Sequence, residues 1–326
     1  MKILITGSSG HLGTALSIVL NKTNHQLVGT DLMAGEHTHL VGDLADKKFV
    51  QTCMKGVDVV FHTATLHKPH IVTHSKQRFI DTNINGTLHL LESAVEAKVK
   101  AFIFTSTTST FGDAMQPSNE EGAVWVTEKL VPIPKNIYGV TKIAAENLCR
   151  LFARNHQLPC LILKTSRFFA EADDNKLLRA NYVDANIKAN ELLYRRVDIQ
   201  DVVDAHLLAM EKALGIGFGK YIISATTPFT ITHLKALQKD TPKVLTNIYP
   251  DFSLIYAKEN WKMFPQIGRV YVNEKARKEL GWQPKYDFAW VLACLKNGVD
   301  FRSPLAKTIG IRGYHQEKFT DGIYPV

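Results

Sequence analysis

The stretch Thr6-Gly7-Ser8-Ser9-Gly10-His11-Leu12-Gly13 decides the fold of this chain. It directly follows the apolar run Lys2–Thr6, which is typical of a buried strand, and it leads into residues 12–20, where apolar residues recur at helical spacing. The glycines therefore lie on a turn from a strand to a helix. In that context a glycine-rich turn indicates a binding site for the pyrophosphate of a dinucleotide.

Glycine is required for a different physical reason at each of its three positions in the turn. Gly7 allows a tight turn, Gly10 lets the backbone approach a pyrophosphate with no Cβ atom in the way, and Gly13 lets the helix pack close to the strand. Asp31 ends the second apolar run, where its carboxylate can bind both ribose hydroxyls and would repel a 2′-phosphate, so NAD is favoured over NADP. The alternative is that Asp31 caps a turn and that the glycines are ordinary turn residues.

Strand-like and helical segments alternate through the first half of the chain. Helical stretches such as 86–97 and 138–155 separate the strand-like runs, which lie at Gln26–Asp31, 57–63, 101–106 and 159–164. This alternation predicts an α/β fold with a doubly wound parallel sheet (Rossmann) and a smaller C-terminal substrate-binding lobe. We expect residues 1–165 to form the dinucleotide-binding domain, with 201–224 returning to it, and residues 166–200 and 225–326 to form the smaller lobe.

The composition excludes several classes of protein. With 326 residues, 45% of them hydrophobic, the chain can bury a large core. It has no apolar run long enough for a signal peptide or a membrane span, and its four cysteines form no C-x-x-C pair, so we expect a cytoplasmic protein with reduced thiols. The net charge is +8, but the basic residues are dispersed, which argues against nucleic acid and for an anionic small-molecule substrate.

Tyr138 and Lys142 form the second informative pair. They are one helical turn apart, so their side chains share a face of the expected helix. Lys142 could hold the nicotinamide ribose, and its positive charge could lower the pKa of Tyr138. To act as a base near neutral pH, a tyrosine needs its pKa lowered by ~3 units, which corresponds to about 4 kcal/mol. The alternative is a tyrosine ring in the core beside a solvated lysine.

Further segments match one protein family in order. They are TGSSGHLG at 6–13, GDL at 42–44, VVFHTAT at 59–65, TNINGT at 82–87, FTSTTSTFG at 104–112, YGVTK at 138–142, DVVDAH at 201–206, SATTPFT at 224–230 and LGWQP at 280–284. With these segments the chain resembles the extended short-chain dehydrogenase/reductase family, in its NAD-dependent epimerase/dehydratase branch. The resemblance implies an NAD-dependent enzyme and a homodimer formed through the helices expected at 86–97 and 138–155.

The resemblance also implies a role for each matching position. Thr107, Tyr138 and Lys142 would be catalytic, with Tyr138 transferring a proton while the Thr107 hydroxyl orients the reacting oxygen. The cofactor-binding residues would be Gly7, Ser9, Gly10, His11, Leu12, Gly13, Asp31, Asp43, Leu44, Ala64, Thr65, Asn83, Thr105, Tyr138 and Lys142.

The chain departs from the family pattern beside the catalytic threonine and after the sixth strand. Dehydratases of the family carry an Asp-Glu pair where this chain has Thr108 and Ser109, so elimination of water is disfavoured. Epimerases acting on UDP-sugars have an asparagine where this chain has Arg167. Arg167 could bind a phosphate or carboxylate, or it could form an ion pair with Glu171 or Asp173.

Arg195 is a second candidate for an anion contact, with Arg196 as the alternative. Adjacent side chains on a strand point to opposite faces, so at most one of the two would enter the site. His67 and Lys68 lie on a loop that would contact substrate, unless that loop is simply solvated. The substrate candidates are therefore His67, Lys68, Thr108, Arg167 and Arg195, and no metal is expected at the cluster formed by His62, His67, His70 and His74.

The sequence thus predicts an NAD-dependent oxidoreductase or epimerase. Its substrate would be a secondary alcohol or ketone of a polar, anionic, sugar-nucleotide-like metabolite, processed by Tyr-Lys-Thr proton and hydride transfer. An epimerase should keep NAD tightly bound, whereas a dehydrogenase must exchange it at each turnover. The alternative is a non-catalytic NAD-binding regulatory protein, against which Thr107, Tyr138 and Lys142 argue.

Overall fold

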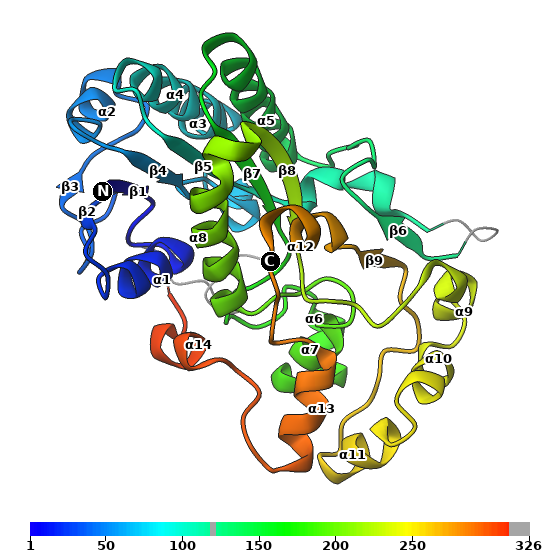
Figure 1. The fold of residues 1–326 in the computed structure, drawn as a ribbon. Coiled ribbons are helices and arrows are strands. Elements are labelled where there is room, and N and C mark those ends of the chain that lie inside the picture. Colours follow the sequence, from blue (N-terminus) through cyan, green and yellow to red (C-terminus); the bar gives the residue numbers. More distant parts are fainter. Residues whose placement is uncertain (118–121, 313–326) are drawn as a thin grey trace.

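A seven-stranded parallel sheet forms the centre of the computed structural model, which describes residues 1–117 and 122–312 (Figure 1). The strand order is β3-β2-β1-β4-β5-β7-β8. The strands are β1 (Lys2–Thr6), β2 (Gln26–Asp31), β3 (Leu40–Val41), β4 (Val59–His62), β5 (Ala101–Thr107), β7 (Cys160–Thr165) and β8 (Phe218–Ile223). The expected doubly wound Rossmann fold is confirmed.

Helices cover both faces of this sheet. On one face, α1 (His11–Leu20) and α8 (Ile199–Ile216) pack over strand residues such as Ile3 and Ile5. On the other face, Leu4 and its neighbours pack against α2 (Lys47–Cys53), α4 (Gly86–Glu96) and α5 (Ile137–His156). Because both faces are covered, the middle positions of β1, β4, β5 and β7 are apolar on both faces.

The chain changes direction across the sheet between β1 and β4. From β1 it runs outward through β2 and β3, and then it returns to place β4 on the other side of β1. The loops that leave the carboxyl ends of β1 and β4 therefore diverge, and a crevice at this point is where open α/β sheets bind ligands.

His62 joins the elements beneath this crevice. Its ring bonds the Thr6 hydroxyl at 2.8 Å through Nδ1 and the Thr87 hydroxyl at 2.9 Å through Nε2. Burial, with a smaller effect of the Lys142 charge, lowers the pKa of His62 well below its usual value, so the ring is neutral at physiological pH. His62 is thus a structural cross-link between β1, β4 and α4.

The C-terminal elements pack beside the sheet around a second core that contains Phe252 and Phe288 (Figure 1). They are α9 (Leu234–Leu237), α10 (Thr241–Ile248), α11 (Phe252–Lys258), α13 (Phe288–Lys296) and β9 (Arg269–Tyr271), which forms a small sheet with β6 (Val124–Val126). α7 (Asp184–Glu191) packs against α13, whereas α6 (Lys176–Asn181) contributes no buried residue. The remaining helices are α3 (Lys76–Ile80), a π-helical turn Asp81–Asn85, α12 (Glu274–Leu280), α14 (Pro304–Ile309) and 3₁₀ turns at Lys68–Val72, Thr108–Phe111, Asp113–Met115 and Ile231–His233.

Asp201 attaches this C-terminal part to α8. Its carboxylate accepts hydrogen bonds from the backbone N–H groups of Lys285 at 2.9 Å and Tyr286 at 3.0 Å, and its carbonyl accepts one from Trp282 Nε1 at 2.9 Å. Trp282 is buried in the same core as α1 and α8. The segment after α12 is therefore held against the main sheet by both polar and apolar contacts.

All four cysteines are buried free thiols. In the part of the chain that the structure describes, no helix combines the length and the apolar character needed to span a bilayer.

Candidate functional site

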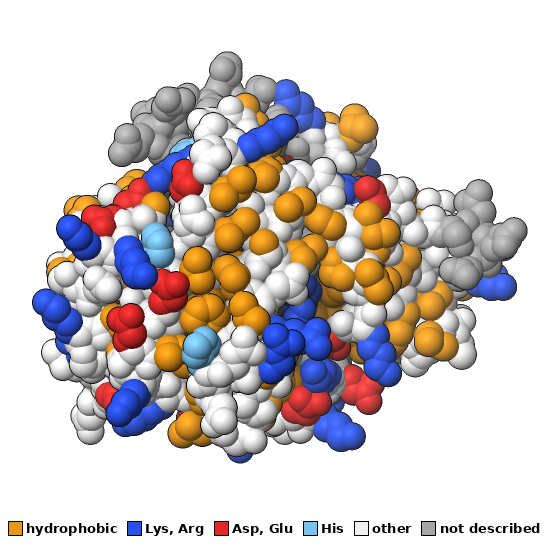
Figure 2. Space-filling view, turned by 90° about the horizontal axis from the view of Figure 1, so that it is seen from above, with side chains coloured by type: hydrophobic (Ala, Val, Ile, Leu, Met, Phe, Trp, Pro, Cys, Tyr) orange, Lys and Arg blue, Asp and Glu red, His pale blue; other side chains and the backbone are white. Residues whose placement is uncertain are grey.

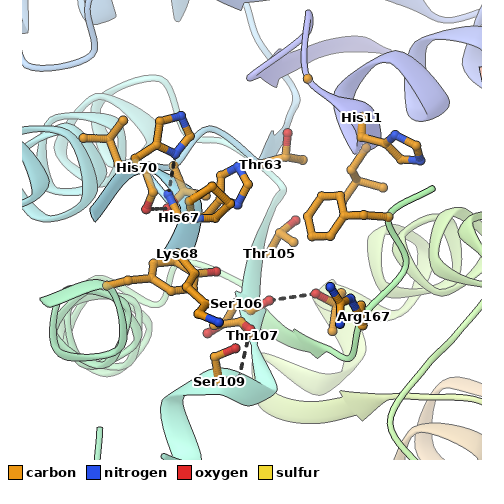
Figure 3. Close-up of a pocket in the computed structure, with 18 of the residues that line it drawn as sticks. His11, Thr63, His67, Lys68, His70, Thr105, Ser106, Thr107, Ser109 and Arg167 are labelled. Carbon is orange, nitrogen blue, oxygen red and sulfur yellow. Dashed lines mark hydrogen bonds between the residues drawn. The ribbon is translucent and has the colours of Figure 1, made fainter. Parts of the chain in front are cut away.

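A cavity of about 950 Å³ lies at the carboxyl ends of β1, β4, β5 and β7 and extends to β9. Its lining begins at the glycine-rich turn, passes Thr107 and Tyr138, and reaches Arg269 and Tyr271. Figure 3 shows His67, Lys68 and His70 on one side, His11 and Arg167 on the other, and residues 105–107 of β5 between them. The crevice expected from the topology is therefore a continuous cavity.

Two glycines of the turn after β1 have no room for a side chain. Gly7 has a φ of +73°, and a Cβ atom there would lie 2.8 Å from the Ala64 nitrogen. A Cβ atom on Gly13 would lie 2.0 Å from the Gly7 carbonyl oxygen, so α1 can start this close to β1 only with glycine at that position. Glycine at both positions thus keeps the amino end of α1 beside β1 at the edge of the cavity, where its free backbone N–H groups can bind a phosphate.

Asp31 is held at the edge of the same cradle. Its Oδ2 accepts a hydrogen bond from the Ser9 N–H at 3.0 Å, and its Oδ1 accepts one from the Met33 N–H at 3.1 Å. Burial raises the pKa of Asp31, and these backbone donors oppose the rise. The carboxylate keeps free lone pairs and lines the cavity, where it can accept ribose hydroxyls.

Most of the residues expected to contact the cofactor line the cavity. They are Gly7, Gly10, His11, Leu12, Gly13, Asp31, Asp43, Leu44, Ala64, Thr65, Thr105 and Tyr138. Ser9, Asn83 and Lys142 instead lie behind the lining. The Ser9 hydroxyl donates to the Met33 carbonyl at 2.9 Å, and the Asn83 amide bonds the backbone N–H and carbonyl of Leu66 and the Thr141 hydroxyl. Asn83 therefore ties the loop after β4 to α5.

Thr107 and Tyr138 meet at the floor of the cavity. Thr107 is the last residue of β5, and its hydroxyl accepts a hydrogen bond from the Ser109 N–H at 3.0 Å. Tyr138 is the second residue of α5, and its hydroxyl lies close enough to the Thr107 side chain for that side chain to affect its pKa. Burial raises the pKa of Tyr138 to about 12, although the Thr107 side chain acts in the opposite direction. The shift is opposite to the one expected from the sequence, because desolvation of the phenolate dominates.

Lys142 follows Tyr138 by one turn of α5 and lies behind the cavity lining. Its ammonium donates to the Thr105 carbonyl at 2.7 Å and lies 4.0 Å from the centre of the Phe104 ring. Burial lowers the pKa of Lys142 to about 7, although the Glu146 carboxylate opposes this. The ammonium therefore supports the end of β5 on which the Thr107 hydroxyl is presented.

Sequence reasoning missed a buried carboxylate beneath the site. Glu146 is buried one turn beyond Lys142 on α5, and it pairs with Lys164 at 2.6 Å and with Lys220 at 3.0 Å. The Ser106 hydroxyl also donates to it, at 2.5 Å. The four-residue spacing of Lys142 and Glu146 was the available signal. Glu146 joins α5 to β5, β7 and β8 under the site.

The arginines of the cavity wall are paired with acids. Arg167 pairs with Asp173 at 2.5 Å, which is one of its two expected alternatives, and Arg195 pairs with Glu191 at 2.6 Å. Arg195 lines the cavity, whereas Arg196 is buried against Glu191 at 2.7 Å. Only Arg195 enters the cavity lining, as expected, but the expectation that the two lie on a strand is wrong: Arg195 lies in the turn after α7, and Arg196 forms an isolated β-bridge with Arg167.

The loops after β4 and β7 meet across the cavity. The His67 ring stacks on Phe169, with centroids 5.6 Å apart and an interplanar angle of 15°. Lys68 forms an ion pair with Asp174. His67, Lys68 and Thr108 all line the cavity. Two contacts thus connect the two loops over the site.

Histidine rings do gather beside this connection. The centroids of His67 and His70 are 4.6 Å apart, and those of His70 and His74 are 5.2 Å apart. Within residues 1–117 and 122–312, no group of three His, Cys, Asp or Glu side chains is arranged to hold a metal ion. The rings pack edge to face instead.

Comparisons with known proteins agree with this architecture. The family model for the NAD dependent epimerase/dehydratase family matches residues 3–223. The UDP-glucose 4-epimerase of Rhizobium meliloti is 26% identical over 88% of this chain and 93% of its own length. An uncharacterized UDP-glucose epimerase of Bacillus subtilis, YtcB, is 30% identical over an aligned segment that covers 52% of this chain and 56% of that relative.

A solved structure shares the fold over nearly the whole chain. It is a UDP-glucuronic acid 4-epimerase from Bacillus cereus in complex with UDP-glucuronic acid and NAD, with a TM-score of 0.62 and 22% identity over 91% of this chain and 98% of that one. The family match covers the glycine-rich turn, Asp31, Thr107, Tyr138 and β8. This chain therefore belongs to the NAD-dependent epimerase/dehydratase family and is an enzyme whose cofactor is NAD.

Proposed function

We propose that this enzyme is an epimerase that oxidises a secondary alcohol of a nucleotide sugar and then reduces the resulting ketone on the opposite face. The observation that carries the proposal is the continuous cavity, which runs from the glycine-rich turn past Thr107 and Tyr138 to Arg269 and Tyr271. Its volume, about 950 Å³, is at the upper end of the range for one small ligand, which suits a cofactor and a substrate bound together. The relatives named as UDP-glucose epimerases support this substrate class.

The end of the cavity nearest β1 would take the cofactor. We infer that the amides of the turn from Gly7 to Gly13 hold the pyrophosphate and that Asp31 binds the adenosine ribose. Asp43 and Leu44 would border the adenine, while Ala64, Thr65 and Thr105 would line the path toward Tyr138. The C-terminal elements around β6 and β9 would form the substrate lobe, and His67, Lys68 and Thr108 would contact substrate.

Tyr138 would move the proton. Its hydroxyl, next to the Thr107 side chain, would receive the proton of a substrate alcohol that the Thr107 hydroxyl orients. When bound, NAD supplies the hydride acceptor, the donor for the return step, and a positive charge that favours the tyrosinate. The return of the proton from Tyr138 Oη completes the cycle, so the protein ends in its starting protonation state.

Elimination of water or carbon dioxide has less support. A dehydratase needs an additional acid and base beside the reacting carbon, and here Thr108 and Ser109 provide only hydroxyl groups. Hydride transfer needs no group beyond Thr107 and Tyr138. Between the two kinds of hydride transfer, the His67–Phe169 stack and the Lys68–Asp174 ion pair favour the epimerase, because connected loops over the cavity slow cofactor exchange.

The enzyme would work as a homodimer in the cytoplasm. Val140 and Leu151 on α5 are 48% and 39% exposed, and Leu88 on α4 and Leu148 on α5 are half-buried beside them. α4 and α5 lie at the top of the molecule in Figure 1, and hydrophobic side chains gather across the middle of the face seen from above in Figure 2. A second copy packed through these helices would cover that apolar surface.

The test is turnover of UDP-glucose and UDP-galactose by the NAD-loaded protein, followed by product chromatography. We expect interconversion without added cofactor and a 10²- to 10⁴-fold loss of kcat in Tyr138→Phe, the range typical of a missing acid–base group. Tyr249→Phe, which changes a tyrosine outside the cavity, is the matched control. Full turnover in Tyr138→Phe would remove the proton-transfer role, and oxidation that accumulates NADH would identify a dehydrogenase instead.

A further inference from the structure

Within the part of the chain that the structure describes, five basic side chains other than histidine line the cavity, and four of them are already paired. Lys68 pairs with Asp174, Lys135 with Asp113 at 3.0 Å, Arg167 with Asp173 at 2.5 Å and Arg195 with Glu191 at 2.6 Å. The fifth is Arg269. Among residues 1–117 and 122–312, no carboxylate lies within ion-pair distance of its guanidinium.

Arg269 is nevertheless well held in place. It begins β9, where it pairs with Val124 of β6, and its guanidinium carbon lies 5.8 Å from the centre of the Tyr271 ring. The side chain is partly buried, and its Nε has no hydrogen-bond partner in the described part of the chain. A buried Nε–H group without an acceptor is unfavourable, so an oxyanion from outside the chain would stabilise this arrangement.

We propose that Arg269 is the residue that binds an oxyanion of the substrate, either a phosphate or a carboxylate. The inference rests on the proposed function, because it takes the β9 end of the cavity as the substrate's position. A planar guanidinium with open terminal nitrogens can bind two oxygens of one phosphate or carboxylate side by side.

This assignment changes the role of the other two arginines. Arg167 and Arg195 were the candidates from sequence, but each is already held by a buried carboxylate that offsets its charge: Asp173 is 3% exposed and Glu191 is fully buried. Breaking such a pair leaves a buried negative charge beside an anionic ligand. Arg167 and Arg195 therefore build the wall, and Arg269 determines binding of the charged substrate.

The experiment measures binding of UDP and of glucuronate to the NAD-loaded protein by isothermal titration calorimetry. The variants are Arg269→Met, which removes the charge, and Arg269→Lys, which keeps the charge but loses the fork. Arg277→Met is the matched control, because Arg277 is exposed on α12 and outside the cavity lining. NAD content and melting temperature report whether each variant folds.

We expect Arg269→Met to weaken the binding of one probe by roughly 10- to 100-fold, the usual range for hydrogen bonds to a charged group, with Arg269→Lys between it and wild type. A loss confined to UDP identifies a phosphate, and a loss confined to glucuronate identifies a carboxylate. Unchanged binding of both probes in Arg269→Met, or a wild type that binds neither probe, would overturn the inference.

The proposed function can fail separately. A wild type that binds UDP through Arg269 but does not interconvert nucleotide sugars would refute the epimerase and leave the anion site standing. A wild type that interconverts them, with the KM of Arg269→Met unchanged, would refute only the role of Arg269. A KM increase with little change in kcat supports Arg269 as a binding residue, because its interaction is the same in the ground state and the transition state.

Discussion

The contribution of Glu191 to the free energy of unfolding can be calculated from its surroundings. Its carboxylate is fully buried and lies 2.6 Å from Arg195, 2.7 Å from Arg196 and 3.5 Å from Arg167. Burial alone would raise the pKa of Glu191, but the guanidinium groups of Arg196, Arg195 and Arg167 lower it from 4.5 to about 2. The change Glu191→Gln removes the charge and keeps the shape of the side chain.

The size of the effect follows from that pKa. Because each pKa unit corresponds to about 1.4 kcal/mol, ionised Glu191 stabilises the folded state by about 3 kcal/mol at neutral pH. A carboxyl whose pKa is depressed on folding contributes fully above its unfolded pKa, and the contribution is lost as the pH falls through the folded pKa. The difference between wild type and Glu191→Gln should therefore shrink to about 2 kcal/mol near pH ~3.5.

Thermal unfolding measures this difference. With the usual unfolding entropy per residue, a loss of about 3 kcal/mol lowers the melting temperature of a chain of this length by about 4 °C. Glu259→Gln, at an exposed position, is the control and should melt as the wild type does. Equal melting temperatures of wild type and Glu191→Gln at pH ~7, or a difference that does not shrink in acid, would refute the reasoning.

Three other predictions concern the cofactor cradle and the exposed helix face. Gly13→Ala places a Cβ atom 2.0 Å from the Gly7 carbonyl oxygen, so we expect NAD affinity, measured by fluorescence titration, to fall more than ~10-fold; unchanged affinity would show that the turn can relax. Asp31→Ala should weaken NAD binding and narrow the preference over NADP in competition assays, whereas an unchanged preference would exclude this carboxylate as the selector. The pair Val140→Glu and Leu151→Glu should convert a dimer into a monomer in sedimentation velocity, and a variant that sediments like wild type would place the interface elsewhere.

The part of the fold that the sequence predicted is the part governed by local pattern. The strand, glycine-rich turn and helix of residues 2–20 are adjacent in the chain, so periodicity and glycine spacing describe them directly. The same holds for the helix that carries Tyr138 and Lys142. The spacing put both residues on one face, but it carried no information about Phe104 and the Thr105 carbonyl, which hold the ammonium.

The part that the sequence did not predict depends on contacts between distant segments. Arg195 was expected on a strand, whereas the turn after α7 is stabilised by Glu191, whose partners are visible only in three dimensions. Arg269 reaches the cavity because β9 pairs with β6, more than a hundred residues earlier in the chain. The pKa of Tyr138 moved in the unexpected direction because the degree of burial cannot be read from spacing.

The most direct test of the central claim is the nucleotide content of the purified protein. The protein is prepared without added nucleotide and denatured, and any released dinucleotide is identified and quantified by chromatography and mass spectrometry. The account predicts close to one NAD per chain, retained beneath the connected loops at His67 and Phe169. A protein that carries no dinucleotide and binds neither NAD nor NADP when they are added would contradict it.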